Sequence, residues 1–476
     1  MNELPLLNEL TEQKPRQIAA QIFQRRATGS DFVEDLLESA LARAQLSNPD
    51  RGLCQELVYG VVRWQATLDW LIARKTPGRT QKVQLQNLLR LGLYQIFWLD
   101  RIPNHAAVNE TVEQAKQGGF GPQAGFINAI LRGYLREFDA TKTLLADLKT
   151  SQPHIGYSHP EWLVARWQKR WGAEKAGQLM DWNNAAPKTF ARINDLKFYR
   201  EHPAADGGTR HSVRAEALDT RSATPRVTLF TFVKDTGELL TQWRNENVDY
   251  DFVRRDWFEE NLIFELKSHP PLAKLPSFQQ GLFYIQDPST LLAVRELNPQ
   301  PGEAILDLCA APGGKLTYMA QLMRNEGRLI AHDTFPDRLK LIEENSTRLG
   351  VTMVKTILPS PLAPHPSPLD RVLVDAPCSN TGVMRRRVAL RWRIRPEEID
   401  RLRATQLDLL HQAAAHLKPG GTLVYSTCSL EPEENEAVVR EFLSGEKNFR
   451  LEAQRELIPF ADATDGAYVA KIIKAS

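Results

Sequence analysis

The sequence predicts an α/β fold in which a mostly parallel sheet with helices on both faces follows an all-helical domain and a small α+β module. Strand-like and helix-like runs alternate from Gly302 onward, which is the pattern of parallel strands joined by crossover helices. Between Glu12 and Phe138, in contrast, apolar residues recur at steps of three and four, the spacing of amphipathic helices. We therefore expect three domains, spanning residues 1–140, 141–295 and 296–476.

Composition indicates an ordinary globular chain. Its 476 residues are 42% hydrophobic, which is enough for each domain to bury a core. The 60 basic and 58 acidic residues leave a net charge of +2, so a nucleic acid would have to be held by local basic patches. The first residues lack the pattern of a secretion signal, and the most apolar run, residues 88–99, is too short to cross a bilayer. We expect a cytoplasmic monomer without a membrane partner.

The four cysteines are predicted to be free thiols. Cys54, Cys309, Cys378 and Cys428 are far apart in the sequence and form no Cys-x-x-Cys pair, so we expect no zinc or other metal site. A reducing compartment keeps such thiols reduced. Cys54 lies in a helical run, where a cysteine is expected to be a small buried hydrophobe.

Chain breakers divide the first domain into several helices. Thr-Pro-Gly at residues 76–78, Ile-Pro-Asn at 102–104 and Gly-Gly at 118–119 each interrupt the apolar periodicity. The last predicted helix, residues 122–138, places its apolar side chains on one side. The pattern by itself describes a helical bundle without a site.

The middle module is predicted to combine helices with short strands. Residues 203–225 are rich in Gly, Thr, Ala, Arg and Asp, which predicts a surface loop or an insertion. The predicted helices are residues 158–184 and 289–297, and the predicted strands are residues 190–194, 227–233, 262–266 and 282–285.

The last domain is predicted to alternate between strands and helices. Its strands are expected at residues 304–308, 327–332, 371–374 and 421–425, and its helices at residues 316–323, 336–349 and 397–417.

A glycine loop follows the first strand of that domain: Cys309, Ala310, Ala311, Pro312, Gly313, Gly314 and Lys315. In such sheets the ligand lies at the carboxyl ends of the strands, where a glycine-rich turn lets backbone amides approach it. The loop lacks the glycine spacing of a P-loop and of a dinucleotide fingerprint. Asp333, after the next strand, is placed to accept hydrogen bonds from ribose hydroxyls. Loop and acid together predict S-adenosylmethionine as the cofactor.

Two cysteines lie in short polar motifs after later strands: Cys378 in Asp-Ala-Pro-Cys-Ser and Cys428 in Tyr-Ser-Thr-Cys-Ser. Carbon 5 of a pyrimidine is a poor nucleophile, but a thiolate added to carbon 6 activates it towards an electrophilic methyl group. A second acid/base group then helps to remove the carbon 5 proton. The sequence predicts these two roles for the two thiols and leaves open which thiol takes which. Asp375 is placed to contact the N3/N4 edge of a cytosine and so to select it over uracil.

Arginines are densest just after the Cys378 motif. Residues 385–403 contain eight arginines and only three acids, and they include Trp392. Such a stretch could hold RNA phosphates beside the target base, with the tryptophan stacking on a base. A solvated helix face is the competing interpretation.

These motifs identify a family. The chain resembles the bacterial Sun/Fmu (RsmB) family of RNA cytosine-5 methyltransferases that act on 16S, small-subunit rRNA. Residues 102–110 and 126–132 resemble a NusB-like helical RNA-binding domain, and the middle module resembles a linking RNA-binding region. The glycine loop, Asp333 and both cysteine motifs match the Rossmann-like methyltransferase domain of the family.

The resemblance implies a role for each site residue. It makes Cys428 the nucleophile, gives Cys378 a part in product release, and places Asp375 beside both the target base and the cofactor. DNA cytosine-5 methyltransferases instead attack with the cysteine of a Pro-Cys motif, so the pattern of residues alone does not assign the two thiols. RNA, most of all small-subunit rRNA, is the expected partner.

The sequence departs from the family at three places. The aspartate that family members carry near the adenine is missing from residues 351–360, where Lys355 and Thr356 are the nearest polar residues. Asn380 stands where glycine is common, and the 203–225 insertion differs from the usual linker. Two alternatives stay open: a tRNA cytosine-5 methyltransferase, and a non-catalytic RNA-binding factor in ribosome assembly.

Overall fold

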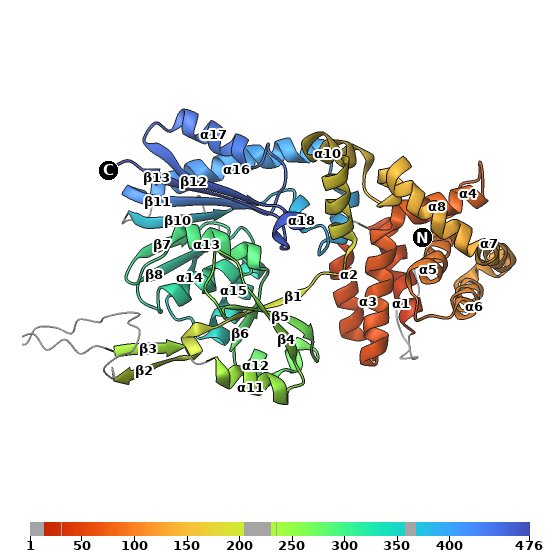
Figure 1. The fold of residues 1–476 in the computed structure, drawn as a ribbon, viewed down its shortest axis with the longest axis horizontal. Helices are drawn as coiled ribbons and strands as arrows, with labels where there is room; N and C mark the ends of the chain where they lie inside the picture. The colour runs from red at the N-terminus through yellow and green to blue at the C-terminus, as the bar shows by residue number, and fades with distance from the viewer. Residues whose placement is uncertain (1–13, 30, 204–229, 235, 358–367) are drawn as a thin grey trace, which may run out of the picture. The chain divides into compact units, whose positions relative to one another are not determined.

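The chain forms two compact units in the computed structural model, which describes residues 14–29, 31–203, 230–234, 236–357 and 368–476 (Figure 1). The first unit consists of Met1–Ala186 together with Val383–Ile394, and the second of Pro187–Gly382 together with Arg395–Ser476. Each unit buries hydrophobic clusters of its own.

Helices build the described part of the first unit. The α5 helix, Val83–Trp98, is buried on most of its surface because apolar residues fill nearly every position from Leu85 to Phe97. It lies close to α3 at Gly60, where a Cβ atom would stand 1.9 Å from the Tyr94 ring. The helices are α1 (Pro15–Thr28), α2 (Val33–Arg43), α3 (Asn48–Arg63), α4 (Gln65–Lys75), α5, α6 (Asn104–Ala115), α7 (Ala124–Arg136), α8 (Phe138–Ser151), α9 (Pro153–Gly156) and α10 (Glu161–Asn184), with short turns η1 (Lys116–Phe120) and η2 (Gly121–Gln123).

A segment from late in the sequence completes this helical core. Val383–Ile394 contains the short 3-10 helix η7, Val388–Trp392, and belongs to the first unit although the residues on both sides of it belong to the second. Val388 and Ala389 are buried in the same cluster as α3 and α5. The chain therefore enters the helical unit twice.

A seven-stranded sheet with helices on both faces forms most of the second unit, in the order β12-β13-β11-β10-β7-β8-β9. The five strands from β11 to β9 are parallel, and β13 is antiparallel to both of its neighbours. The strands are β7 (Ala304–Asp307), β8 (Arg328–His332), β9 (Val354–Ile357), β10 (Leu369–Asp375), β11 (Leu417–Thr427), β12 (Phe449–Leu457) and β13 (Ala467–Lys474).

The helices of this unit cover the sheet in two layers (Figure 1). Apolar residues of α13, α14 and α15 share one buried cluster with the sheet, and those of α16 and α17 share another. The helices are α13 (Leu291–Leu297), α14 (Gly314–Leu322), α15 (Pro336–Leu349), α16 (Pro396–His416), α17 (Glu436–Gly445) and the short α18 (Pro459–Asp462).

A small antiparallel sheet precedes the large one, in the order β4-β5-β1-β6. Phe190 and Ile263 from it lie in the same buried cluster as α13 and α14, so the small module and the large sheet share a core. The elements are β1 (Thr189–Ile193), β4 (Asp249–Val253), β5 (Ile263–Ser268), β6 (Phe283–Ile285), the pair β2 (Tyr199–Pro203) and β3 (Phe230–Lys234), α11 (Gly237–Asn245) and α12 (Pro276–Gln279). The insertion predicted at residues 203–225 lies almost wholly outside the described residues.

Candidate active site

The predicted site residues converge at the carboxyl ends of four neighbouring strands. Asp307 ends β7, Asp333 follows β8, Asp375 ends β10, and Ser426 lies at the end of β11. These strands are adjacent in the order β11-β10-β7-β8, so residues more than a hundred positions apart meet at one edge. This is the edge at which open α/β sheets bind their ligands.

The glycine loop, Cys309–Lys315, turns from β7 into α14 and lies against the end of β8. The Ala310 amide donates to His332 O over 2.9 Å, and the Gly313 amide donates to Ala310 O over 2.8 Å. Gly313 has a φ of 100°, which favours glycine. A Cβ on Gly314 would stand 3.1 Å from the Tyr284 ring. The predicted loop is therefore a tight turn that starts a helix.

Asp333 is held beside this loop with one oxygen left for a ligand. It is 2% exposed, and its Oδ2 accepts a hydrogen bond of 3.1 Å from the Ala311 amide. Arg338 Nη1 lies 3.3 Å from Oδ1, but Oδ1 accepts no well-formed hydrogen bond from the described residues. A ribose hydroxyl is a donor that could reach such an oxygen.

Asp307 is a candidate that the sequence analysis missed. It is 1% exposed, and neither of its oxygens accepts a well-formed hydrogen bond from the described residues. Burial, and after it the charge of Asp375, raises the pKa of this carboxyl to about 8, although Lys315 and the nearby Cys309 amide oppose the shift. A buried acid without a partner calls for a polar or cationic ligand group. Asp307 lies at the end of a strand. The argument from position that identified Asp333 could therefore have identified Asp307 as well.

Arg192 fastens the glycine loop from the small module and was also missed. This side chain is 0% exposed and lies on β1. Its Nη1 donates to Gly314 O over 2.7 Å, and its Nη2 donates to Thr317 Oγ1 over 2.9 Å. Burial lowers the pKa of the guanidinium to about 10, far above neutrality. A fixed positive charge thus holds the first turn of α14.

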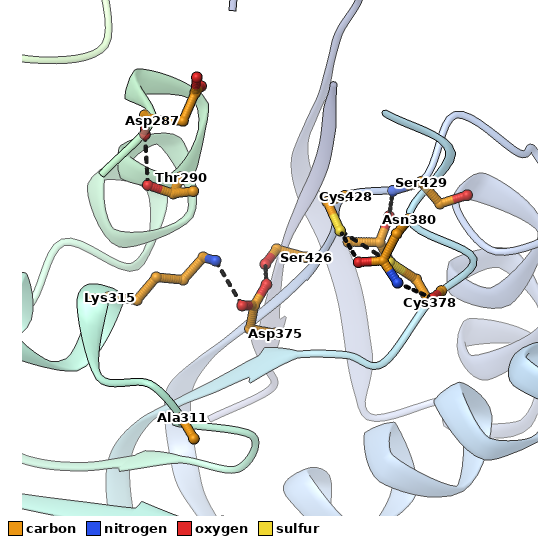
Figure 2. Close-up of polar contacts among 12 residues, drawn as sticks. Asp287, Thr290, Ala311, Lys315, Asp375, Cys378, Asn380, Ser426, Cys428 and Ser429 are labelled. Carbon is orange, nitrogen blue, oxygen red and sulfur yellow. Dashed lines mark hydrogen bonds and ion pairs between the residues drawn. The ribbon is translucent and has the colours of Figure 1, made fainter. Parts of the chain in front are cut away.

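Lys315 and Asp375 form an ion pair between the cofactor loop and the cysteines. Lys315 Nζ lies 2.6 Å from Asp375 Oδ2, and Ser426 Oγ donates to Asp375 Oδ1 over 2.7 Å. Figure 2 shows Lys315 pointing at Asp375, which also faces Ser426. Burial lowers the pKa of Lys315, but the charge and hydrogen bond of Asp375 outweigh it and raise the pKa overall.

The two predicted cysteines lie side by side around Asn380 (Figure 2). Cys378 Sγ and Cys428 Sγ are 3.3 Å apart, and the Cys428 thiol donates to Asn380 Oδ1 over 3.0 Å. Asn380 Nδ2 donates to Cys378 O over 2.6 Å, and its φ of 57° is one that asparagine tolerates better than most residues. Cys378 is 7% exposed, whereas Cys428 is partly exposed.

The two thiols differ in their electrostatics. The hydrogen bond to Cys428 and then burial raise the pKa of Cys378 well above its ordinary value, and the charges of Cys428 and Glu434 add to this. Cys378 is therefore the buried, protonated thiol of the pair, and Cys428 is the one that a substrate can reach.

The other two cysteines are packed. Cys54 is 0% exposed in the helical unit, and burial raises its pKa to about 11. Burial also raises the pKa of Cys309, so neither thiol is a ready nucleophile. Among the described residues no group of three or more His, Cys, Asp or Glu side chains could hold a metal ion. Within the same ranges no helix is long and apolar enough to cross a membrane.

Two arginines of the arginine-rich stretch, Arg385 and Arg391, are buried and make structural contacts, so these two are not placed to hold RNA phosphates. Arg391 is 0% exposed and donates to Asn184 Oδ1 over 2.8 Å and to Asn183 O over 3.0 Å. Arg385 is 2% exposed over the Trp182 ring, and the Trp392 indole donates to Val62 O. In the second half, on α16, Arg401 and Arg403 are more exposed and pair with glutamates.

The expected adenine contacts stay open. Thr356 Oγ1 donates to Glu343 on α15 over 2.9 Å, and Lys355 is exposed. Residues 358–360 of the segment without the usual aspartate lie outside the described ranges. Both candidates lie on β9, next to β8 and Asp333.

Comparison with known proteins identifies the family. A model described as 16S rRNA methyltransferase RsmB/F matches residues 294–473, the NusB family matches residues 13–136, and an RsmF/B-like ferredoxin-like domain matches residues 159–206. A probable ribosomal RNA small subunit methyltransferase B from Synechocystis is 35% identical over 92% of this chain and 90% of its own length. The chain belongs to the RsmB/F family of RNA methyltransferases.

Other relatives agree with this assignment. The ribosomal RNA small subunit methyltransferase B of Escherichia coli O157:H7 is 34% identical over 96% of this chain and 98% of its own. A solved methyltransferase homologue from Pyrococcus horikoshii is 29% identical, covers 67% of this chain and 97% of its own, and has a TM-score of 0.52. The crystal structure of PH0851, 23% identical with a TM-score of 0.72, covers 98% of this chain and 100% of its own and shares the fold.

Family membership confirms several predictions. The Sun/Fmu (RsmB) resemblance, the α/β fold with a Rossmann-like methyltransferase domain, the NusB-like helical domain and the small α+β module are all confirmed. This RsmB/F-family enzyme is an RNA methyltransferase that uses S-adenosylmethionine.

Proposed function

We propose that this enzyme methylates carbon 5 of a cytosine in small-subunit rRNA through a covalent adduct with Cys428. The observation that carries the proposal is the pair of thiols 3.3 Å apart, one reachable and one buried, on loops that follow neighbouring strands of the cofactor-binding edge. The names of the relatives support small-subunit rRNA as the substrate.

The residues at the strand ends fit the cofactor. Asp333 Oδ1, which lies near Arg338 but accepts no well-formed hydrogen bond from the described residues, suits a ribose hydroxyl. The Asp307 carboxyl, which accepts no well-formed hydrogen bond from them either, suits the ammonium of the methionine moiety. Arg192 holds the turn between them in place. S-adenosylmethionine supplies an electrophilic methyl group when it is bound there.

Cys428 then activates the base. Addition of its sulfur to carbon 6 makes carbon 5 nucleophilic, and the new carbon–sulfur bond must later break to restore the ring. Asp375, already fixed by Lys315 and Ser426, keeps free lone pairs with which to accept a hydrogen bond from the cytosine amino group.

The buried thiol suits the second role. In the free enzyme the hydrogen bond to Cys428 is the largest cause of the raised pKa of Cys378, ahead of burial, and the charge of Cys428 adds to it. Once the Cys428 sulfur is bonded to carbon, that charge is gone and Cys378 ionises more readily. After its own proton has passed to solvent, the Cys378 thiolate can take the carbon 5 proton as the Cys428 thiolate leaves, so that the reaction releases one proton overall.

The test is methyl transfer from labelled S-adenosylmethionine to unmodified small-subunit rRNA and to total tRNA, followed by nucleoside analysis. We expect 5-methylcytidine in the rRNA, no label with Cys428→Ala, and an RNA adduct that survives denaturing gels with Cys378→Ala. Cys54→Ala is the matched control and should behave as the wild type does, because Cys54 lies in the helical core.

Other outcomes would overturn parts of the proposal. Label confined to tRNA would move the substrate, and methylcytidine of another position would remove the carbon 5 assignment. Full transfer by Cys428→Ala would contradict the covalent role. Tight rRNA binding without transfer, together with rescue of ribosome assembly by Cys428→Ala, would favour the non-catalytic assembly factor.

A further inference from the structure

Glu434 is a buried acid that contacts both cysteine loops. It is 0% exposed and lies in the turn between β11 and α17. Its Oε1 accepts from the Ser379 amide over 2.8 Å, and its Oε2 accepts from Ser429 Oγ over 2.5 Å and from Ser379 Oγ. Ser379 directly follows Cys378, and Ser429 directly follows Cys428. One carboxylate thus holds the residue after each thiol.

The residue before each thiol is also fastened through this turn. The side-chain amide of Gln406 on α16 donates from Nε2 to Glu434 Oε1 over 3.0 Å and to Pro377 O over 2.9 Å. Next to Glu434, Asn435 Oδ1 accepts from Thr427 Oγ1 over 2.6 Å. Each cysteine therefore lies between two residues that are tied to the pair Glu434 and Asn435.

The turn is itself anchored to the sheet. Tyr425, fully buried on β11, donates its hydroxyl to Glu434 O over 2.6 Å, and the Glu434 amide donates to Glu431 O over 3.0 Å. The backbone of Glu434 is therefore tied to β11, the strand that leads to Cys428. A buried carboxylate with four donors is costly to leave unpaired, so the network locks its members in one arrangement.

We propose that Glu434 is a positioning residue that sets the distance between the two thiols by fastening the loop after each of them. The proposal deepens the covalent mechanism proposed above and rests on it for its catalytic meaning. Its geometric part, that the carboxylate keeps the two sulfur atoms in contact, stands on the hydrogen bonds alone. Methyl transfer needs this contact because the second thiol must reach the adduct formed by the first.

The experiment measures the distance between the thiols without RNA or cofactor. The full-length protein is treated with diamide, which accepts two electrons and two protons as the Cys378 and Cys428 thiols form a disulfide, and the loss of two thiols is followed by mass spectrometry after alkylation. Wild type should cross-link readily, since the sulfur atoms already touch. Glu434→Ala should cross-link at least about tenfold more slowly, and its transfer rate should fall about 100-fold.

Two further variants separate positioning from general damage. In Glu434→Gln the amide oxygen still accepts from Ser379 and Gln406, and both serine hydroxyls can turn to accept from its NH₂ group, so cross-linking should stay within about threefold of wild type. Ser429→Ala removes the tie between Glu434 and the Cys428 loop, together with the contacts of Ser429 Oγ to Ser379 Oγ, Thr381 Oγ1 and the Glu431 amide, and should give an intermediate rate. Glu441→Gln, an exposed acid on α17, is the control and should change nothing.

The outcomes are distinguishable from those of the proposed function. If Glu434→Ala retains wild-type melting and cross-links as fast as wild type, the positioning role is overturned even if cytosine methylation is established. If no RNA is methylated but cross-linking slows as described, the covalent mechanism fails and the geometric role remains. Should Glu434→Ala not fold, a Ser429→Ala cross-linking rate equal to that of wild type would overturn the proposal.

Discussion

The sheet edge has a cofactor side, formed by the residues after β7 and β8, and a thiol side, formed by the loops after β10 and β11. The buried acids on the two sides differ in how many hydrogen bonds they accept. On the cofactor side, neither oxygen of the buried Asp307 accepts a well-formed hydrogen bond from the described residues, and neither does Asp333 Oδ1, which has only the ion pair with Arg338. On the thiol side Glu434 accepts four hydrogen bonds. A buried acid left without donors marks a place for a ligand, whereas a saturated one fixes the groups around it.

Cys428→Ala should impair the chemistry on the thiol side alone, and it should cause the largest loss of methyl transfer among the variants. We expect methyl transfer to fall by at least about 10⁴-fold, because the neighbouring Cys378 is buried and burial raises the pKa of Cys309, so neither can replace the Cys428 nucleophile. Binding of S-adenosylmethionine, measured by calorimetry, should stay within about twofold. A parallel loss of cofactor affinity would show that the two sides are not separate.

Asp307→Asn should instead weaken cofactor binding and leave the thiol side unchanged. Asparagine cannot ionise to pair with the cofactor ammonium as the Asp307 carboxyl can, so S-adenosylmethionine binding should weaken about 10- to 100-fold, or about 1.4 to 2.7 kcal/mol. Glu344→Gln, on the exposed face of α15, is the matched control. Unchanged affinity in Asp307→Asn would show that the unpartnered carboxyl has another role.

The raised pKa of Asp307 predicts that the stability of the protein depends on pH. The pKa of this carboxyl is raised from an ordinary value of 3.8 to about 8, so the contribution that it makes to folding is complete below about pH 3.8 and is lost as the pH rises through 8. Wild type should therefore lose stability relative to Asp307→Asn between about pH 4 and about pH 8, at up to about 1.4 kcal/mol per pH unit, and should change little relative to it above that range. Melting curves at pH 6 and 8.5 measure this, and parallel curves for the two proteins would contradict it.

Arg192→Lys tests how the glycine loop is held. Lysine keeps the charge but not the two-pronged contact with Gly314 O and Thr317 Oγ1. The KM for S-adenosylmethionine should rise about tenfold while kcat changes little, since the thiol side is untouched. A loss confined to kcat would place the effect of Arg192 elsewhere.

Asn380 should show the smallest effect. Its φ of 57° suits glycine, so Asn380→Gly should change the free energy of unfolding by less than about 1 kcal/mol. Asn380→Ala, which adds strain at the same φ, should cost about 1 to 2 kcal/mol. Urea unfolding distinguishes the two, and equal costs would show that the side-chain contacts outweigh the backbone.

Local patterns in the sequence predicted much of this fold and site. The helix at residues 336–349 coincides with α15, and the glycine loop and both cysteines lie at the predicted strand ends. Each depends on neighbours in the sequence: a strand, a turn and a helix start. The edge strand β12 was missed because most of its residues are exposed and charged, so it lacks an apolar signal.

Properties that arise only from three-dimensional packing could not be predicted. Gly382 was not singled out, yet a Cβ there would lie 2.7 Å from Cys428 O, so only glycine allows the two cysteine loops to lie this close. Glu434 and Arg192 gain their roles largely from distant partners, which include Gln406, 28 positions from Glu434, and Thr317, 125 positions from Arg192. The charge pattern of residues 385–403 could not show that Arg385 and Arg391 are buried, because burial and not charge density decides what an arginine contacts.

The return of Val383–Ile394 to the helical unit has a consequence for recombination between related genes. The helical unit is not encoded by one continuous stretch of gene, since this short passage returns to it from within the catalytic sequence. A fragment ending at Ala186 would lack Arg391 and leave Asn183 O and Asn184 Oδ1 without this donor. Recombination that exchanged the N-terminal half between relatives would pair the helices of one protein with the Val383–Ile394 segment of another. Selection should therefore keep the two halves of the gene together.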